Sequence, residues 1–213
     1  GDVRVGTVDS WLIWRLTGGA EHLCEAGNAS RTLLYDITGL DWSHDLLEIF
    51  GLPATAMPAV MASDQGFGMT SGVPLVPDKT PILAVLDDSH AALYGHGCTD
   101  VGSAKATYGT GSSVMAPVAE LSTSEARVPT TLAWVIDKSP TYALEGNILS
   151  SGATLAWAAD LLTDGRVADL VALAETVPDS GGATLVPAFS GLGAPYWYRE
   201  SHALLSAMSP STT

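Results

Sequence analysis

Residues 81–95 of the chain read PILAVLDDSHAALYG, and this stretch decides the expected fold. Residues 81–86 are wholly apolar and begin with a proline, which predicts a short strand buried on both faces. Residues 89–94 are predicted to form the start of a helix. Asp87 and Asp88 therefore stand between a buried strand and a helix. In open α/β sheets, ligands bind at such carboxyl ends of strands.

Other helices are predicted where a capping residue precedes apolar residues and a glycine follows. They cover residues 7–16, 41–50 (capped by Ser43, with Leu46, Leu47, Ile49 and Phe50 buried), a stretch from Ser150 or Ser151 to Gly165, and 167–176. Strands are predicted at residues 103–108, 112–117, 131–136, 141–145 and 183–189, the first four joined by turns at 109–111 and 137–140.

The composition indicates a folded protein with a substantial core. The chain has 213 residues, of which 46% are hydrophobic and 15% are charged, enough for one or two domains. No stretch approaches the roughly 18 apolar residues of a transmembrane helix, and the first residues do not resemble a signal peptide. Two cysteines cannot form a disulfide framework or a four-cysteine zinc site, so we expect a cytoplasmic protein.

The net charge of −14, from 9 basic and 23 acidic residues, narrows the class of partner. Nucleic acid and anionic membranes are disfavoured, because the chain offers them no basic patch. A small anionic ligand stays open, since backbone N–H groups and a metal ion can hold phosphates without Lys or Arg.

Asp88 is the first candidate for chemistry. A carboxylate at the mouth of a cleft can act as general base toward a hydroxyl group. The alternative is that Asp87 and Asp88 only cap the following helix, a common role for aspartate. One of the two can cap while the other points into a cleft.

Two glycine-containing segments are candidates for binding an anion. Residues 108–112 read YGTGS, and glycines in such a turn let a ligand approach the backbone N–H groups. Gly152 stands near a helix start, where N–H groups favour anions. The alternatives are an ordinary tight hairpin and close packing of helix on strand. Neither a Walker A motif nor G-x-G-x-x-G occurs in the chain.

Hydrolase and metal sites find little support. Ser89 and His90 are adjacent, so their side chains diverge on a helix and cannot pair as nucleophile and base. No G-x-S-x-G motif occurs. His90 and His96 lack the i, i+4 spacing of helical metal ligands, and we expect no metal held by protein side chains, the histidines being surface or structural residues.

Several short segments carry a resemblance to a known family. In chain order they are GTVDSWLIWRLTG (6–18), NASRT (28–32), LDW (40–42), DSHAALYG (88–95), TYGTG (107–111), YALEG (142–146) and PAFSGLGAPYW (187–197). In order and spacing they resemble the FGGY carbohydrate kinase family, and its glycerol kinase-like branch most closely. The resemblance runs nearly the whole length of the chain.

The resemblance implies an α/β, actin/hexokinase-like fold of two ribonuclease H-like domains with a cleft between them. Only the middle of such a two-domain kinase is expected here. Residues 1–92 would be the C-terminal part of the N-terminal (substrate) domain. Residues 93–213 would be the N-terminal part of the C-terminal (nucleotide-binding) domain.

The resemblance also implies ATP- and Mg²⁺-dependent phosphorylation of a polyol or sugar hydroxyl, by positioning and electrostatic stabilisation. Asp88 would be the general base. The nucleotide phosphates would be bound by Gly109, Thr110, Gly111 and Gly152. The substrate would be bound by Asp88, Ser89 and Ser113. Expected partners are a polyol or sugar and ATP, and a homodimer stays open.

Three positions depart from the family pattern. Ser89 and Ala156 stand where glutamines are expected, and Ser113 stands where an aromatic residue is expected. A polyol other than glycerol, or a ketose, therefore stays open. So does a catalytically dead binding or interaction module derived from a sugar kinase. We expect these 213 residues alone to be inactive and poorly folded, because sheet edges would lack partners.

Overall fold

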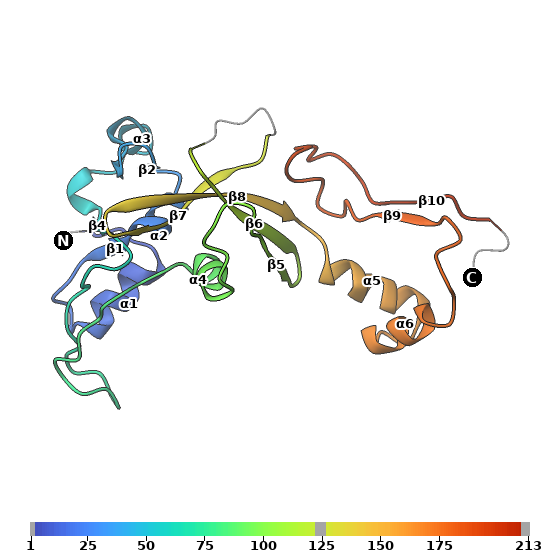
Figure 1. Cartoon of the computed structure of the whole chain (residues 1–213), viewed down its shortest axis with the longest axis horizontal. Coiled ribbons are helices and arrows are strands. Elements are labelled where there is room, and N and C mark those ends of the chain that lie inside the picture. The colour runs from blue at the N-terminus through green and yellow to red at the C-terminus, as the bar shows by residue number, and fades with distance from the viewer. Residues whose placement is uncertain (1–2, 122–126, 210–213) are drawn as a thin grey trace. The chain divides into compact units, whose positions relative to one another are not determined.

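The computed structural model describes residues 3–121 and 127–209 as a mixed α/β structure (Figure 1). Its helices are α1 (Val8–Leu16), α2 (Ala26–Ser30), α3 (His44–Ile49), α4 (Asp88–Gly95), α5 (Gly152–Leu162) and α6 (Val167–Ala174), with a 3₁₀ turn, η1 (Ala54–Ala56). Its strands are β1 (Leu23–Glu25), β2 (Tyr35–Asp36), β3 (Asp41–Trp42), β4 (Ala59–Met61), β5 (Lys105–Tyr108), β6 (Ser112–Val118), β7 (Thr130–Ile136), β8 (Ser139–Ile148), β9 (Thr184–Val186) and β10 (Leu204–Ser206).

The chain divides into two compact units. The first comprises the described residues of Gly1–Lys105, Ala116–Thr123 and Thr130–Leu144, and the second those of Ala106–Met115, Ser124–Pro129 and Glu145–Thr213. Strands β5, β6, β8 and β7 pair in that order, while β1-β4, β2-β3 and β9-β10 form two-stranded sheets. The domain boundary between residues 92 and 93 stays a prediction.

Helix α1 confirms the helix predicted at residues 7–16, and local chemistry ends it. The hydroxyl of Thr17 donates to the Ile13 carbonyl at 2.8 Å. Gly18 and Gly19 follow with φ of +66° and +87°, a backbone conformation that glycine adopts without steric strain. Ile13 is buried, so α1 turns one face toward the core of the first unit.

Helix α3 confirms the predicted cap but not the predicted burial. Ser43 Oγ accepts a hydrogen bond from the Leu46 N–H at 3.4 Å. Leu47 is buried, whereas Ile49 and Phe50, which the sequence predicts to be buried, are 75% and 66% exposed. A helix of fewer than two turns presents little more than one column of side chains to a core.

The buried strand predicted at residues 81–86 is wrong. The segment is extended but belongs to no ladder, and its side chains are exposed or half-buried. Ile82 exchanges two backbone hydrogen bonds with residues 67–68, and Val85 donates to the Ser63 carbonyl at 3.1 Å. These described bonds all run toward residues 63–68, and the segment does not form the inner strand of a sheet covered on both faces that the prediction required.

Both predicted hairpins are confirmed. Residues 109–111 join β5 to β6, which are neighbours in the four-stranded sheet. Asp137 and Lys138 join β7 to β8 with φ of +49° and +63°, as in the type I′ turns that suit twisted strands. Residues 131–135 of β7 are all buried.

The second unit contains α5, α6 and the antiparallel pair β9-β10. The helices follow the prediction, whereas β9 is shorter than the strand predicted at residues 183–189. Ala159 is the buried residue of α5, and α6 has none, so most apolar side chains of these helices are partly or largely exposed. Trp157 packs against Phe189 with ring centroids 4.9 Å apart. Within the described residues, no helix combines the length and apolarity needed to cross a bilayer.

The core of the first unit lies where α2 and β1 pack against β7. Its buried members are Cys24, Ala26, Ala29, Tyr35, Leu132 and Val135. Trp42 packs edge-on against Tyr35, with ring centroids 5.6 Å apart. Burial and the nearby Asp9 carboxylate raise the pKa of the Cys24 thiol to about 12, so this cysteine behaves as a small apolar residue.

Glu25 places a fully buried carboxylate in this core. Its Oε1 accepts from the Gly27 N–H at 2.9 Å and from Ser63 Oγ at 2.6 Å. Its Oε2 accepts from the backbone and side-chain amides of Asn28, each at 2.9 Å. Ser63 Oγ accepts in turn from the Val135 N–H at 3.0 Å. Burial raises the pKa of the Glu25 carboxyl, against the lowering effect of these donors.

Replacing this carboxylate gives a test with a defined pH dependence. Because the raised pKa makes the folded state bind the proton more tightly, the Glu25 contribution to the unfolding free energy falls as pH rises above the ordinary value of 4.5. Glu25→Gln removes that titration and turns an amide N–H₂ toward two donors, which costs about 1–3 kcal/mol. We expect the variant to be less stable in urea unfolding, with a deficit that shrinks as pH rises.

The matched control is Glu48→Gln, which neutralises an exposed glutamate of α3. Its stability should stay within about 0.5 kcal/mol of the unmodified protein. A Glu25→Gln deficit that is constant with pH, or no larger than that of the control, contradicts the role given to this carboxylate.

Candidate active site

The two aspartates at the start of α4 lie in different surroundings. Asp87 is the N-cap, and its Oδ1 accepts from the Ser89 N–H at 3.1 Å. Asp88 Oδ1 lies 2.7 Å from the same N–H, but its side chain is exposed whereas Asp87 is half-buried. Asp87 therefore caps the helix, and Asp88 keeps its second carboxylate oxygen for another group.

A pocket of about 920 Å³ opens beside Asp88, and we call it the Asp88 pocket. Its walls are largely apolar and come from α1 and residues 82–86. The charged and amide side chains that line it are Asp9, Asn28, Arg31, Asp87 and Asp88. Pockets of this size and mixed lining are typical of small-molecule sites.

No role was expected for Asn28 or Arg31, although both stand in the NASRT segment that carries the resemblance. Asn28 is held in place because its side-chain amide donates to Glu25. In the sequence, residues 28–32 are only recognisable as a segment of small and polar residues. Such a pattern does not show which cavity the side chains line.

His90 lies on the inner face of α4 and is fully buried. Its Nδ1 is 3.9 Å from Asp87 Oδ1, and its Nε2 is 3.5 Å from Thr131 Oγ1 on β7. A Cβ atom at Gly27 would lie 2.9 Å from His90 Nδ1, so α2 and α4 pack closely there. This histidine therefore joins the start of α4 to the core.

The two predicted substrate-binding serines are not brought together in one unit. Ser89 is half-buried in α4 and is not among the residues that line the Asp88 pocket. Ser113 is half-buried on β6, in the part of that strand that belongs to the second unit.

The hairpin turn 109–111 packs against the start of α5 within the second unit. The N–H groups of Ser151 and Ala153 donate to the Thr110 carbonyl at 2.9 and 3.1 Å, and that of Gly152 donates to the Gly109 carbonyl at 2.9 Å. The first N–H groups of α5 are thus already bonded. Within the described part of the chain, the N–H groups of Thr110 and Gly111 have no such acceptor.

Glycine is required at two of these positions by backbone contact. A Cβ atom at Gly152 would lie 2.5 Å from the Gly109 carbonyl oxygen. A Cβ atom at Gly111 would lie 2.8 Å from the Ile148 carbonyl oxygen. Of the two interpretations left open for Gly152, the geometry therefore supports close packing, and the turn presents its free N–H groups at residues 110 and 111.

No protein-built metal centre is evident in residues 3–121 and 127–209. There, histidine, cysteine, aspartate and glutamate side chains do not gather in groups of three or more that could hold an ion.

Comparison with known proteins assigns the class. The model of the FGGY family of carbohydrate kinases, N-terminal domain, matches residues 3–95, and that of the C-terminal domain matches residues 104–213. The chain therefore belongs to the FGGY family of carbohydrate kinases, with the actin-like ATPase fold of its structural neighbours.

Within the family, the chain is similar to glycerol kinases. It is 46% identical to the glycerol kinase of Alkalilimnicola ehrlichii over 214 residues and 42% identical to that of Myxococcus xanthus over 217. Each match covers 100% of this chain but 43% and 44% of the relative. The chain thus spans less than half the length of the curated relatives it matches.

Solved structures agree on the fold. The crystal structure of Plasmodium falciparum glycerol kinase with ADP matches 98% of this chain and 42% of that chain, with a TM-score of 0.87 and 32% identity. The ligand-bound xylulose kinase from Lactobacillus acidophilus matches 96% of this chain and 42% of that chain, with a TM-score of 0.79 and 20% identity, which shows the fold alone.

The contact between Gly152 and the hairpin can be tested by adding one methyl group. Gly152→Ala forces the α5 start away from Gly109 and costs about 1–3 kcal/mol, more than the roughly 1 kcal/mol that alanine gains in a helix. We expect lower stability in urea unfolding and faster hydrogen exchange at the Gly152 position and its neighbour Ala153.

Gly146→Ala on β8 is the control, because a Cβ atom there meets nothing within 4 Å. Equal stability of the two variants, or unchanged exchange at residues 152–153 in Gly152→Ala, argues against the close contact.

Proposed function

We propose that the whole protein to which this chain corresponds transfers the γ-phosphoryl group of ATP to a hydroxyl group of a polyol or sugar. The observation that carries the proposal is the exposed Asp88 carboxylate at the rim of a small-molecule pocket, in a chain that belongs to a carbohydrate kinase family. The similarity to glycerol kinases favours a glycerol-like polyol as acceptor, and the departures at Ser89, Ser113 and Ala156 leave a ketose open.

Asp88 is the proposed general base. Because Asp87 already caps α4, the second carboxylate oxygen of Asp88 is left to act as the base. It accepts the proton of the substrate hydroxyl group while the hydroxyl oxygen of the substrate attacks the γ-phosphorus and ADP leaves. Ser89, next to Asp88, and Ser113 on β6 are the proposed substrate-binding serines, and Asn28 and Arg31 join them because they line the same pocket as Asp88.

The turn 109–111 is the proposed phosphate site. The N–H groups of Thr110 and Gly111 and the exposed Thr110 hydroxyl are the donors, and Gly152 leaves the room for the turn to approach α5. With 9 lysines and arginines in the chain, backbone donors suit an anion here better than basic side chains. Mg²⁺ is the proposed metal ion, and when bound with the nucleotide it would supply the charge neutralisation that this transfer needs.

We also propose a domain boundary and a cellular compartment for the protein. The substrate domain would end at residue 92 and the nucleotide-binding domain begin at residue 93. Cys24 and Cys98 are both free thiols, which suits a reducing cytoplasm. The 213 residues alone would not turn over ATP, because the relatives use more than twice this length.

Asp88→Asn tests the base in a protein that spans the full length of the relatives. We expect kcat for polyol phosphorylation to fall at least ~100-fold, because positioned general bases contribute about 10²–10⁴. The affinity for ATP, measured by calorimetry, should stay within about twofold, since Asp88 is not assigned to the nucleotide.

Asp45→Asn, which removes an exposed charge from α3, is the control and should leave kcat unchanged. Full turnover by Asp88→Asn removes Asp88 from the mechanism. Nucleotide binding without turnover by the unmodified protein, across a panel of polyols and ketoses, would instead identify a catalytically dead binding module.

A further inference from the structure

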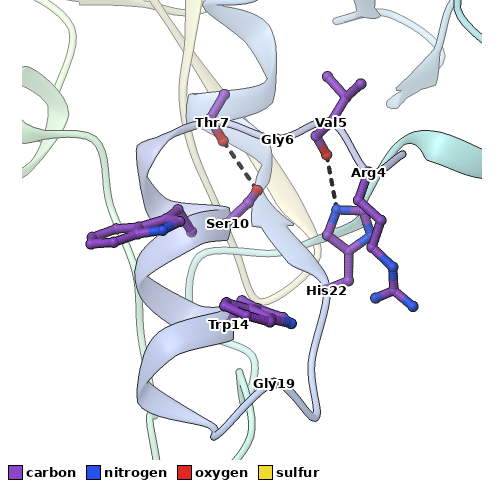
Figure 2. Close-up of a pocket in the computed structure, with 9 residues that line it drawn as sticks. Arg4, Val5, Gly6, Thr7, Ser10, Trp14, Gly19 and His22 are labelled. Carbon is purple, nitrogen blue, oxygen red and sulfur yellow. Dashed lines mark hydrogen bonds between the residues drawn. The ribbon is translucent and has the colours of Figure 1, made fainter. Parts of the chain in front are cut away.

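A second pocket, of about 580 Å³, lies on another side of α1, and we call it the Trp14 pocket. Figure 2 shows Arg4 and His22 on one side of it, Thr7 and Ser10 above, and Trp14 below. Gly6 and Thr7 line both this pocket and the Asp88 pocket, whereas Asp88 lines the latter alone. The two cavities are therefore separate sites, and Gly6 and Thr7 form part of the wall of each.

The side chains of His22, Thr7 and Ser10, which line the Trp14 pocket, are held in place by hydrogen bonds within the protein. His22 Nε2 is hydrogen-bonded to the Val5 carbonyl at 2.8 Å, which orients the ring and makes Nε2 the donor (Figure 2). Ser10 is buried, and its hydroxyl lies 3.3 Å from that of Thr7. Such fixed groups lose little freedom when a ligand binds.

The backbone around these side chains is packed closely as well. A Cβ atom at Gly6 would lie 2.7 Å from Ser10 Cβ, so the chain at residue 6 fits directly over α1. Gly19, with φ of +87°, packs against Trp14, since a Cβ atom at this glycine would lie 3.4 Å from the indole. The Trp14 ring is thereby supported, and 41% of this residue is exposed.

The charge of the pocket contrasts with that of the chain. The chain carries a net charge of −14, yet among the described residues that line the Trp14 pocket there is no aspartate or glutamate, and the nearest carboxylate, that of the buried Asp9, accepts a hydrogen bond from Thr7. Its ionisable groups are Arg4 and His22. An arginine fork matches phosphate oxygens, and an indole surface packs against the carbon skeleton of a small ligand.

We propose that the Trp14 pocket binds a small organic phosphate monoester. Its phosphate interacts with the Arg4 guanidinium, one of its hydroxyl groups reaches Thr7, and its carbon skeleton packs on Trp14. This site is distinct from the Asp88 pocket and does not depend on the proposed kinase activity.

The test is calorimetry and amide NMR of a protein that spans the full length of the relatives, with glycerol 3-phosphate as the probe. We expect binding that perturbs the amides of Ser10 and His22. Arg4→Gln should weaken it about tenfold or more, as loss of one charge-assisted contact does. Trp14→Leu should also weaken it. Asp88→Asn should not, which separates this site from the proposed active site and leaves the result independent of whether the kinase proposal holds.

Arg15→Gln is the matched control, because it removes the same charge from α1 at a residue outside the pocket lining. It should bind glycerol 3-phosphate as the unmodified chain does. The proposal is overturned if Arg15→Gln weakens binding as much as Arg4→Gln, or if glycerol or gluconate binds as tightly as glycerol 3-phosphate. It is also overturned if the perturbed amides lie at the Asp88 pocket instead.

Discussion

A buried carboxylate that four neutral donors satisfy is the constraint on which the first unit depends. Glu25 accepts from two backbone N–H groups at the start of α2, from Asn28 Nδ2 and from Ser63 Oγ. Ser63 then bonds to β7 and, through its carbonyl, to Val85, two residues before Asp87. One side chain thereby orients the α2 wall of the Asp88 pocket and anchors the segment that leads into α4. Without its donors, a buried carboxylate is strongly unfavourable, so these elements form together.

The second unit depends on backbone contact instead of buried charge. The carbonyls of the turn 109–111 accept from the first N–H groups of α5, which requires glycine at residue 152, and the Ile148 carbonyl requires glycine at residue 111. The N–H groups at the start of α5, which often bind an anion, are thus bonded to protein carbonyls. Within the described residues, the backbone N–H groups without such a partner are those of residues 110 and 111. In a chain with a charge of −14, these free backbone donors support the proposal that phosphate binds at the turn 109–111.

Local chemistry made much of the fold predictable. Ser43, Asp87 and the turn 109–111 act through neighbours within a few residues, so the sequence shows the helix starts and hairpins directly. Asp88 beside a helix start was predictable for the same reason. The Glu25–Ser63 bond spans 38 residues along the chain, and the link to Val135 spans 72, so no local pattern reveals them. The prediction of a buried strand at residues 81–86 was wrong, because an apolar run does not show whether other elements cover both of its faces.

The proposed enzyme transfers the γ-phosphoryl group of ATP to a sugar or polyol hydroxyl. The most direct measurement is the fate of the label from γ-labelled ATP, incubated with Mg²⁺, a panel of polyols and ketoses, and a protein that spans the full length of the relatives. We expect the label to appear in a phosphate ester of one acceptor, in a yield equal to the ADP formed. Label released only as inorganic phosphate, or retained entirely in ATP with every acceptor, would contradict it.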